Sequence, residues 1–219
     1  MMQRKPIQKY YYSVEGETEE WYLRWLEQLI NDDSNSIFKV SIQSKIEKDP
    51  LKYAKKLNMI SRTIVTHLCD YESNDTEHTT QFRGTLNSLK ETSRQGKKID
   101  YRLGYSNFTF ELWITLHKAD CNTSYNHRRQ YLDPINRGFN EKFTELAQYK
   151  RESDFKRILR KISLSDVKDA VKRAKIIMQR NKQNGLVPHE YKGFHYYADN
   201  PSLTIGDSIE SILKDCKLL

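Results

Sequence analysis

The stretch YYYSVEGETE at residues 10–19 decides the expected fold of this chain. Its aromatic and β-branched residues predict a strand that ends at Glu15, and an amphipathic helix follows directly after Gly16. Glu15 and Glu19 are four residues apart, so they face the same way if the helix starts at once. A carboxylate at the C-terminal end of a strand lies where open α/β sheets bind their ligands. This pattern therefore predicts a binding site at the end of the first strand.

A second predicted strand, at residues 63–69, also ends in acidic residues, Asp70 and Glu72. It is nearly all apolar or β-branched, which is typical of a central strand of a parallel sheet. If the two acidic ends meet at one edge, their carboxylates could hold Mg²⁺ or Mn²⁺, which prefer oxygen ligands. The alternative is structural, because acidic residues stabilise the first turn of a helix and aspartate is common in turns.

Strands and helices alternate along the first 120 residues. Strands are expected at 9–15, 37–43, 63–69 and 99–105, with helices at 17–31, 50–59, 79–95 and after Asn107. This alternation predicts an α/β fold with a small, mostly parallel sheet between helices. After residue 120 the pattern is helical, at 139–149, 152–162, 165–183 and from 205 onward, and no further strand is expected. We therefore divide the chain into an α/β core at 1–120 and a helical extension at 121–219.

The composition is that of a folded, basic protein. Of the 219 residues 37% are hydrophobic, 30% are charged and 11% are aromatic, and the net charge is +8. Between residues 125 and 182 there are sixteen Lys and Arg against seven Asp and Glu, so the predicted helical half carries the excess. A basic surface of this extent favours contact with nucleic acid, although charge also serves solubility.

Four basic side chains stand out on the helix at 165–183, where an apolar stripe would dock the helix on the core. They are candidates for phosphate contacts: Lys168, Lys172, Arg173 and Lys175. For any one of them a solvated helix face is an equally ordinary interpretation.

The segment SNFTFELWITLH at residues 106–117 forms a second constellation. Ser106 and Asn107 lie at a strand-to-helix junction, where Asn107 could bind a phosphate or a metal-bound water, or act as an ordinary N-cap. Glu111 lies within an apolar helix face and needs a partner, either a lysine or arginine or the site itself. His117 is interpreted as a partly buried residue at the helix end.

Three scattered cysteines, with no CxxC pair, predict neither a disulfide framework nor a zinc site. The first residues lack the apolar core of a secretion signal, and no stretch is apolar enough to span a membrane. We therefore expect a cytoplasmic protein without a membrane partner.

Four motifs together resemble the RloB/AbiLii-like family, in order and over nearly the whole chain. They are VEGETE at 14–19, the acidic pair at 70–72, SNxxFELWxxLH at 106–117 and NPSxT at 200–204. The opening motif is shared more loosely with Toprim domains. The resemblance implies a Toprim-like core whose metal ligands fall on Glu15, Glu19, Asp70 and Glu72. Glu72 stands where aspartate is usual, and Asp75 could substitute for it.

The resemblance implies a Mg²⁺- or Mn²⁺-dependent nuclease that acts as a toxic effector in bacterial antiphage defence. Its substrate would be RNA, with tRNA as one candidate, or DNA, and its partner an ATPase of the ABC/SMC kind. Glu15 would bind metal and serve as the base, Asp70 and Glu72 would hold the ion, and Glu19 would assist a second one. Ser106 and Asn107 would shape the phosphate side, with Asn107 in the catalytic set. Self-association is left open.

Two other functions remain open from the sequence. The chain could be a non-catalytic binding or sensor subunit of a defence complex that contains the ATPase. It could also act on or sense a nucleotide, which would require a closed small-molecule pocket.

Overall fold

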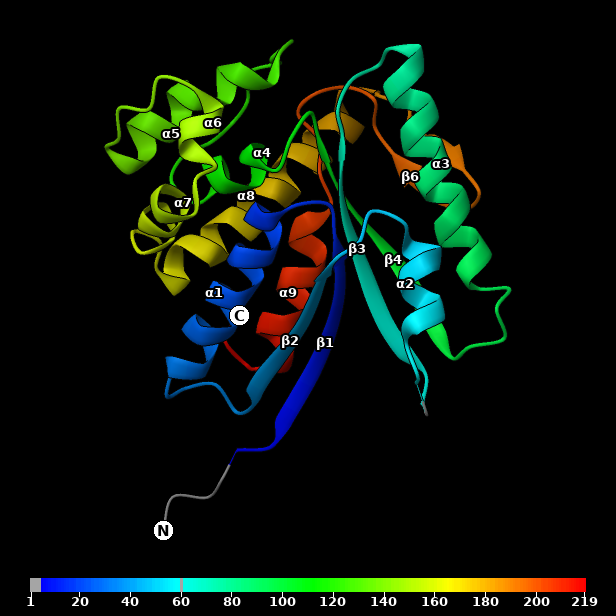
Figure 1. Ribbon diagram of the computed structural model, residues 1–219. Coiled ribbons are helices and arrows are strands. Elements are labelled where there is room, and N and C mark those ends of the chain that lie inside the picture. Colours follow the sequence, from blue (N-terminus) through cyan, green and yellow to red (C-terminus); the bar gives the residue numbers. More distant parts are fainter. Residues whose placement is uncertain (1–4, 60) are drawn as a thin grey trace.

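The computed structural model describes residues 5–59 and 61–219. Residues 1–4, on which the expectation about a secretion signal partly rests, lie outside this part of the chain. A four-stranded sheet forms the centre of the molecule (Figure 1), and all its strand pairs are parallel. The strands are β1 (Ile7–Val14), β2 (Lys39–Ile46), β3 (Thr63–Tyr71) and β4 (Ile99–Asn107), in the order β2-β1-β3-β4. The predicted α/β fold with a parallel sheet is confirmed.

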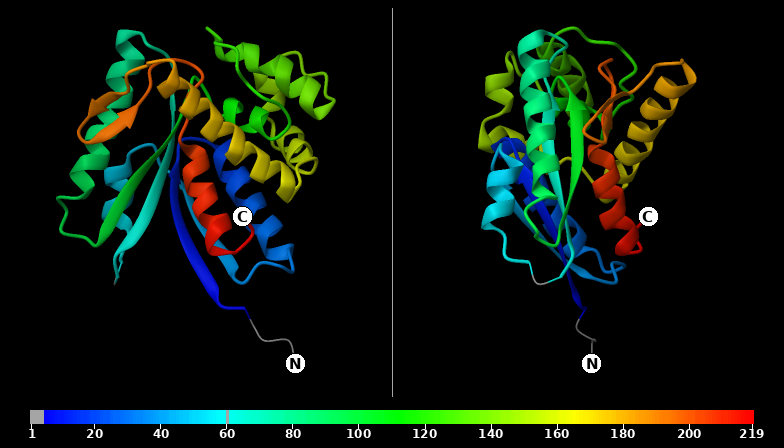
Figure 2. Two further views of the ribbon diagram at one scale, coloured as in Figure 1. Left: turned by 180° about the vertical axis from the view of Figure 1, so that it is seen from behind. Right: turned by 90° about the vertical axis from the view of Figure 1, so that its right-hand side faces the viewer.

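Helices cover both faces of the sheet, as Figures 1 and 2 show. α2 (Pro50–Lys56) and α3 (Thr76–Thr92) pack on one face, and α1 (Glu17–Asp32) and α9 (Ile205–Asp215) pack on the other. Because side chains alternate along each strand, the two faces bury two separate hydrophobic clusters. Leu68 belongs to the cluster under α1, whereas its neighbour Cys69 belongs to the cluster under α3.

The connections that follow β1 and β3 lead to opposite edges of the sheet. From β1 it passes through α1 to β2 on one side, and from β3 it passes through α3 to β4 on the other. β1 and β3 pair along four residues each, 11–14 and 65–68, and separate toward their N-terminal ends. Their C-terminal ends therefore lie together at the switch point of the sheet, which is the usual ligand position in open α/β folds.

The chain after β4 consists mainly of helices that pack on one another and on α1 and α9. They are α4 (Glu111–Leu116), η1 (Arg128–Tyr131), α5 (Leu132–Phe139), α6 (Leu146–Tyr149), α7 (Glu152–Leu159) and α8 (Leu164–Gln183). α8 and α9 lie side by side (Figure 2). One hydrophobic cluster contains Tyr22 and Trp113 together with Phe155 and Ile209, so it joins the two halves. The division at residue 120 stays a prediction.

The expectation that no strand follows residue 120 was wrong. β5 (His189–Tyr191) and β6 (Phe194–Tyr196) form a short antiparallel hairpin. The turn between them has positive φ at Lys192 and Gly193, which matches the twist of a two-residue hairpin. Three-residue strands are too short to show the alternation by which strands are recognised. Among the described helices, none combines the length and the apolar character needed to cross a membrane.

Candidate functional site

Glu15 and Asp70 meet at the switch point of the sheet. Glu15 follows the last residue of β1, and Asp70 lies next to the end of β3. The backbone N–H of Asp70 donates a hydrogen bond to Oε2 of Glu15 at 3.1 Å. β2 lies between β1 and β3 in the sequence, but β1 and β3 are adjacent in the sheet. The contact therefore depends on the strand order. The structure thus brings together the two acidic strand ends that the sequence singled out.

Glu19 turns back toward these residues from the first turn of α1. Gly16 is the N-cap residue, so the helix starts at once, and Glu19 is only 6% exposed. The Thr18 hydroxyl donates to its Oε2 at 3.0 Å. A Cβ atom on Gly16 would lie 3.0 Å from the same oxygen, so a glycine at this position leaves room for the carboxylate. A residue that served the helix dipole alone would be solvated instead of buried.

Glu111 brings a fourth carboxylate to the same place from the start of α4, and its side chain is 0% exposed. The Thr109 hydroxyl donates to Oε2 of Glu111. Nζ of Lys150, at the end of α6, lies 3.2 Å from Oε1. From the sequence, Glu111 could have either a basic partner or a place in the site itself, and no partner was identified. Lys150 follows Glu111 by 39 positions, and the tertiary packing of α6 selects it from the many basic residues of this half.

We call Glu15, Glu19, Asp70 and Glu111 the acidic centre. Burial and the charges of Glu19 and Glu72 together raise the pKa of Glu15 to about 7, although the hydrogen bond from Asp70 and the charge of Lys48 lower it. Burial also raises the pKa of Asp70, with Glu19, Glu15 and Glu111 adding to the effect. The pKa of Glu19 is raised by burial and by Glu111. Like charges at short range in a buried place cannot all remain ionised without a proton or a cation.

Lys150 is the cation that the protein itself supplies to this centre. Burial alone would lower the pKa of its ammonium group, but Glu111, Asp70 and Glu19 outweigh burial, and the pKa is raised. Its side chain is 39% exposed, so Lys150 spans from the buried carboxylates to solvent.

The acidic centre fits a hard divalent cation by its donor chemistry. Carboxylate oxygens are the ligands that Mg²⁺ and Mn²⁺ prefer. Burial and neighbouring carboxylates raise the pKa values of Glu15 and Asp70, so their ionised forms are disfavoured without a cation. In residues 5–59 and 61–219, no three His, Cys, Asp or Glu side chains already surround a common point as a metal-binding group. A bound ion would therefore require the carboxylates to turn toward it.

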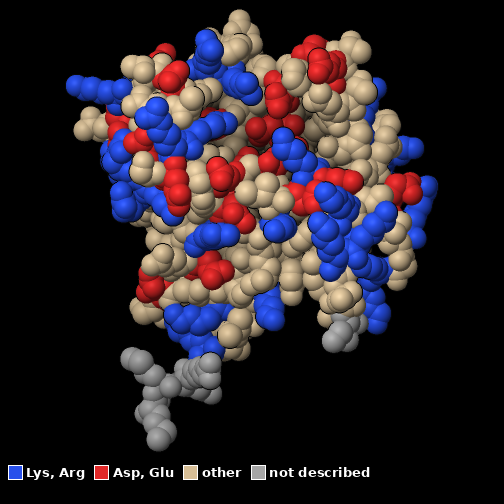
Figure 3. Space-filling model, viewed as in Figure 1, with Lys and Arg blue, Asp and Glu red and all other residues tan. Residues whose placement is uncertain are grey.

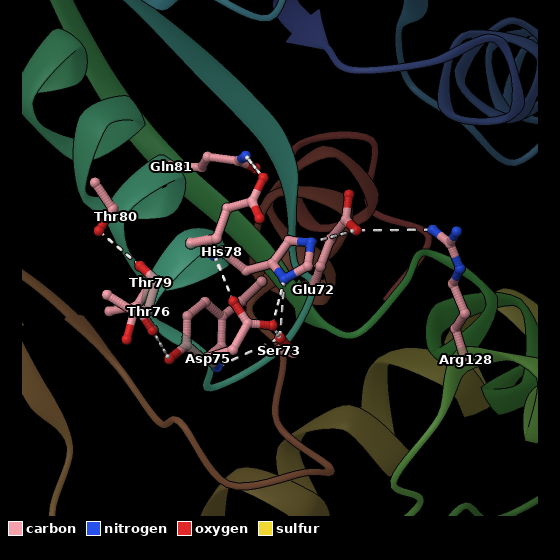
Figure 4. A network of polar contacts seen from close by, with 11 residues as sticks. Glu72, Ser73, Asp75, Thr76, His78, Thr79, Thr80, Gln81 and Arg128 are labelled. Atoms are coloured by element: carbon pink, nitrogen blue, oxygen red, sulfur yellow. Dashed lines mark hydrogen bonds and ion pairs between the residues drawn. The ribbon is translucent and has the colours of Figure 1, made fainter.

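Glu72, the fourth predicted ligand, lies at the rim. Its carboxylate is exposed and contacts Nε2 of His78 at 3.3 Å and a guanidinium nitrogen of Arg128 at 3.7 Å (Figure 4). Asp75, the suggested substitute, caps α3 instead: it accepts from the backbone N–H of His78 at 2.8 Å and contacts the ring Nδ1 at 2.6 Å. Both side chains have protein partners outside the acidic centre.

Ser106 and Asn107 are buried and bonded within the protein. Ser106 donates to the Thr109 carbonyl at 2.9 Å. Asn107 donates to the Tyr197 carbonyl at 3.3 Å and accepts from the Ser202 hydroxyl. α4 begins at Glu111 with Phe110 as its N-cap, so the N-cap interpretation of Asn107 was wrong. Ser202 belongs to the NPSxT motif, which thus anchors the end of β4. The roles predicted for Ser106 and Asn107 at the phosphate stay predictions.

The four basic candidates on α8 differ in their surroundings. Arg173 pairs with Asp120 at 3.0 Å and donates to the Leu116 carbonyl at 2.7 Å, so it ties α8 to α4. Lys175 pairs with Glu210 of α9 at 2.6 Å. Lys172 is exposed and Lys168 is partly exposed. His117 is buried, where its ring contacts the Tyr22 hydroxyl at 3.1 Å and the Trp113 carbonyl at 3.0 Å, which is a structural environment.

The surface is hollowed above the strand ends, and acidic side chains gather around the hollow while Lys and Arg lie to its left (Figure 3). A cavity of about 690 Å³ lies at the opposite end of the sheet. It is bounded by α9 and by the parts of β1 and β3 that separate from each other. None of the predicted site residues lines that cavity. The candidate site is therefore the acidic centre at the C-terminal ends of β1 and β3, away from this cavity.

Comparison with known proteins agrees with the resemblance seen in the sequence. No curated protein and no solved structure matches the chain. A family model described as RloB-like protein matches residues 10–212. The match includes the C-terminal part of β1, all the acidic-centre residues and most of α9. The chain belongs to the RloB-like family.

Proposed function

We propose that this protein is a metal-dependent nuclease that acts as a toxic effector in bacterial antiphage defence, together with an ABC/SMC-type ATPase. Membership of the RloB-like family is consistent with a defence-related role. The observation that carries the proposal is the acidic centre, whose carboxylates are buried or partly buried at the switch point of a parallel sheet. The pKa values of Glu15, Glu19 and Asp70 are raised. RNA or DNA would be the substrate.

In this proposal Glu15, Glu19 and Asp70 hold Mg²⁺ or Mn²⁺, and Glu72 joins them if it leaves His78 and Arg128. A bound ion of this kind polarises a phosphodiester and activates a water molecule. Glu15 would also serve as the base that accepts a proton from the water molecule. Glu111 holds the ammonium group of Lys150 beside the centre, where it offsets charge on a phosphate.

The test is cleavage of total bacterial RNA and of plasmid DNA by purified protein with Mg²⁺ or Mn²⁺. We expect Glu15→Gln and Asp70→Asn to abolish cleavage and toxicity while the protein still folds. Glu17→Gln is the matched control, because Glu17 is an exposed carboxylate two residues after Glu15, in the first turn of α1. Retained toxicity in both site variants would refute the proposed site.

A non-catalytic binding or sensor subunit of the same defence complex is the second candidate. It is favoured by the ion pair of Lys150 with Glu111, through which the protein supplies its own cation to the centre. In that case metal binds weakly, no cleavage occurs even with the ATPase present, and substitutions on the basic surface impair function more than substitutions of the carboxylates.

A further inference from the structure

A small basic cavity opens beside the acidic centre. It has a volume of about 340 Å³ and is lined by Arg128, Arg129, Glu145, Leu146, Ala147 and Lys150. Cavities that bind small ligands start at about 300 Å³, so this one has room for a single nucleotide unit and not for a double helix. Lys150 belongs to the cavity and also contacts Glu111, so the cavity and the acidic centre share a residue.

The backbone that carries the two arginines is held in place. In η1, Nδ1 of His127 accepts from the Arg129 backbone at 3.1 Å, and the Gln130 side chain accepts from the His127 backbone at 3.0 Å, which forms a capping box. The next residue, Tyr131, is buried and donates to Asn200 at 2.9 Å. The arginines thus project from a supported turn.

The guanidinium groups themselves are available for a ligand. Arg128 contacts Glu72 at 3.7 Å, and both side chains are about half exposed, so this pair contributes little and can rearrange. The exposed Arg129 forms no ion pair within the described residues. Glu145 is the one acidic side chain of the cavity lining, so the three cations outnumber it. Arginine forks match phosphate oxygens in bidentate geometry.

We propose that this cavity binds a backbone phosphate of the substrate strand, next to the phosphate that lies at the acidic centre. The inference deepens the proposed nuclease function and rests on it. The four carboxylates of the acidic centre repel phosphate, so a strand bound there needs cations beside them. Arg128 and Arg129 supply the attraction on one side, and Lys150 connects their cavity to the carboxylates. An unpaired strand is the substrate that fits, because its phosphates can enter a cavity one at a time.

The test measures binding and not cleavage. The Asp70→Asn protein is titrated against fluorescently labelled single strands of about 12 nucleotides, one of RNA and one of DNA, with fluorescence anisotropy as readout. We expect Arg129→Gln to weaken binding about tenfold through loss of a charge-assisted contact, and to lower the salt dependence between about 50 and 200 mM. Arg129→Lys should restore part of the affinity. Arg160→Gln is the control, since Arg160 is an exposed arginine outside the cavity.

The outcomes separate this inference from the nuclease proposal. In one outcome Arg129→Gln and Arg160→Gln bind the strands with equal affinity, while the wild-type protein cleaves in an Asp70-dependent manner. This outcome would overturn phosphate binding in the cavity and support the nuclease activity. A specific loss of binding in Arg129→Gln, with no cleavage by wild type, would support the cavity and overturn the nuclease. A double-stranded probe that binds as tightly as the single strands and is equally sensitive to Arg129→Gln would overturn the preference for unpaired strands.

Discussion

Asp70 donates its backbone N–H to Oε2 of Glu15 at 3.1 Å, across 55 positions of sequence. The hydrogen bond lowers the pKa of Glu15, but burial and the neighbouring carboxylates Glu19 and Glu72 raise it more, to about 7. The contact holds two acidic groups together that would repel each other when both are charged. The clustered carboxylates of the acidic centre therefore lower the stability of the folded protein, which is typical of functional sites.

The first prediction concerns pH. The pKa of Glu15 in the folded protein, about 7, is above its unfolded value of 4.5, so the folded state binds the proton more tightly. The contribution of Glu15 to stability is thus greatest below about pH 4.5 and is lost as the pH rises to about 7. At about 1.36 kcal/mol per pKa unit, the loss is on the order of 3 kcal/mol at most.

Buried histidines act in the opposite direction. The pKa values of His67 and His117 are lowered to about 4 by burial, so their contribution to stability is lost as the pH falls below about 6.5. The contribution of Glu15 is therefore measured as the difference in the free energy of unfolding between wild type and Glu15→Gln, in urea without metal. We expect Glu15→Gln to gain stability relative to wild type as the pH rises from about 5 to about 7.5. Parallel curves would contradict the raised pKa.

The second prediction concerns metal binding. Under the proposed function, Mg²⁺ or Mn²⁺ binds the folded state and stabilises it by about 2.7 kcal/mol at a hundredfold excess over Kd. For a chain of this size the melting temperature should rise on the order of 5–10 °C. Asp70→Asn should remove most of this rise. Glu72→Gln should retain it, because Glu72 contacts His78 and Arg128 at the rim. Loss of the rise in Glu72→Gln would show that Glu72 turns inward to the ion.

The third prediction concerns Gly16. A Cβ atom there would lie 3.0 Å from Oε2 of Glu19, so Gly16→Ala should displace this carboxylate. We expect the cleavage rate and the affinity for the metal to fall about tenfold. The free energy of unfolding without metal should change by less than about 1 kcal/mol. Gly84→Ala is the control: it lies in α3 with no atom within 4 Å of its added Cβ, and it should stabilise the helix by about 0.5–1 kcal/mol. Full activity in Gly16→Ala would show that the Glu19 carboxylate can shift without loss of function.

The fourth prediction concerns the Lys150–Glu111 ion pair. Lys150→Met leaves the Glu111 carboxylate buried without its cation and should destabilise the protein by about 1–3 kcal/mol, less than for a fully buried pair because Lys150 is 39% exposed. Adding Glu111→Gln should recover part of this loss, since a neutral amide needs no counterion. The measurement is a double-mutant cycle in urea, with the exposed Lys142→Met as control. Strict additivity would show that the two charges do not interact.

Much of the fold could be predicted because it depends on local pattern. The strand at residues 63–71 was recognised from its apolar, β-branched run, and the helix after Gly16 from its apolar face. The hairpin at residues 189–196 was missed because its strands have three residues each. The bounds of β2 were shifted, from 37–43 to 39–46, because its alternation is weak. The contacts of Asn107 with Ser202 and Tyr197 could not be predicted, because these residues follow it by 90 positions or more.

The sequence by itself determined the α/β alternation, the acidic residues that end two strands, and the basic character of the second half. Those features follow from periodicity and from residue types next to one another in the chain. Tertiary structure alone decided that β1 and β3 are neighbours, that Lys150 is the cation beside Glu111, and that Arg128 and Arg129 line a cavity next to it. The physical reason is that these contacts join residues far apart in sequence. Chain packing and burial set their distances and pKa values, and no local pattern records them.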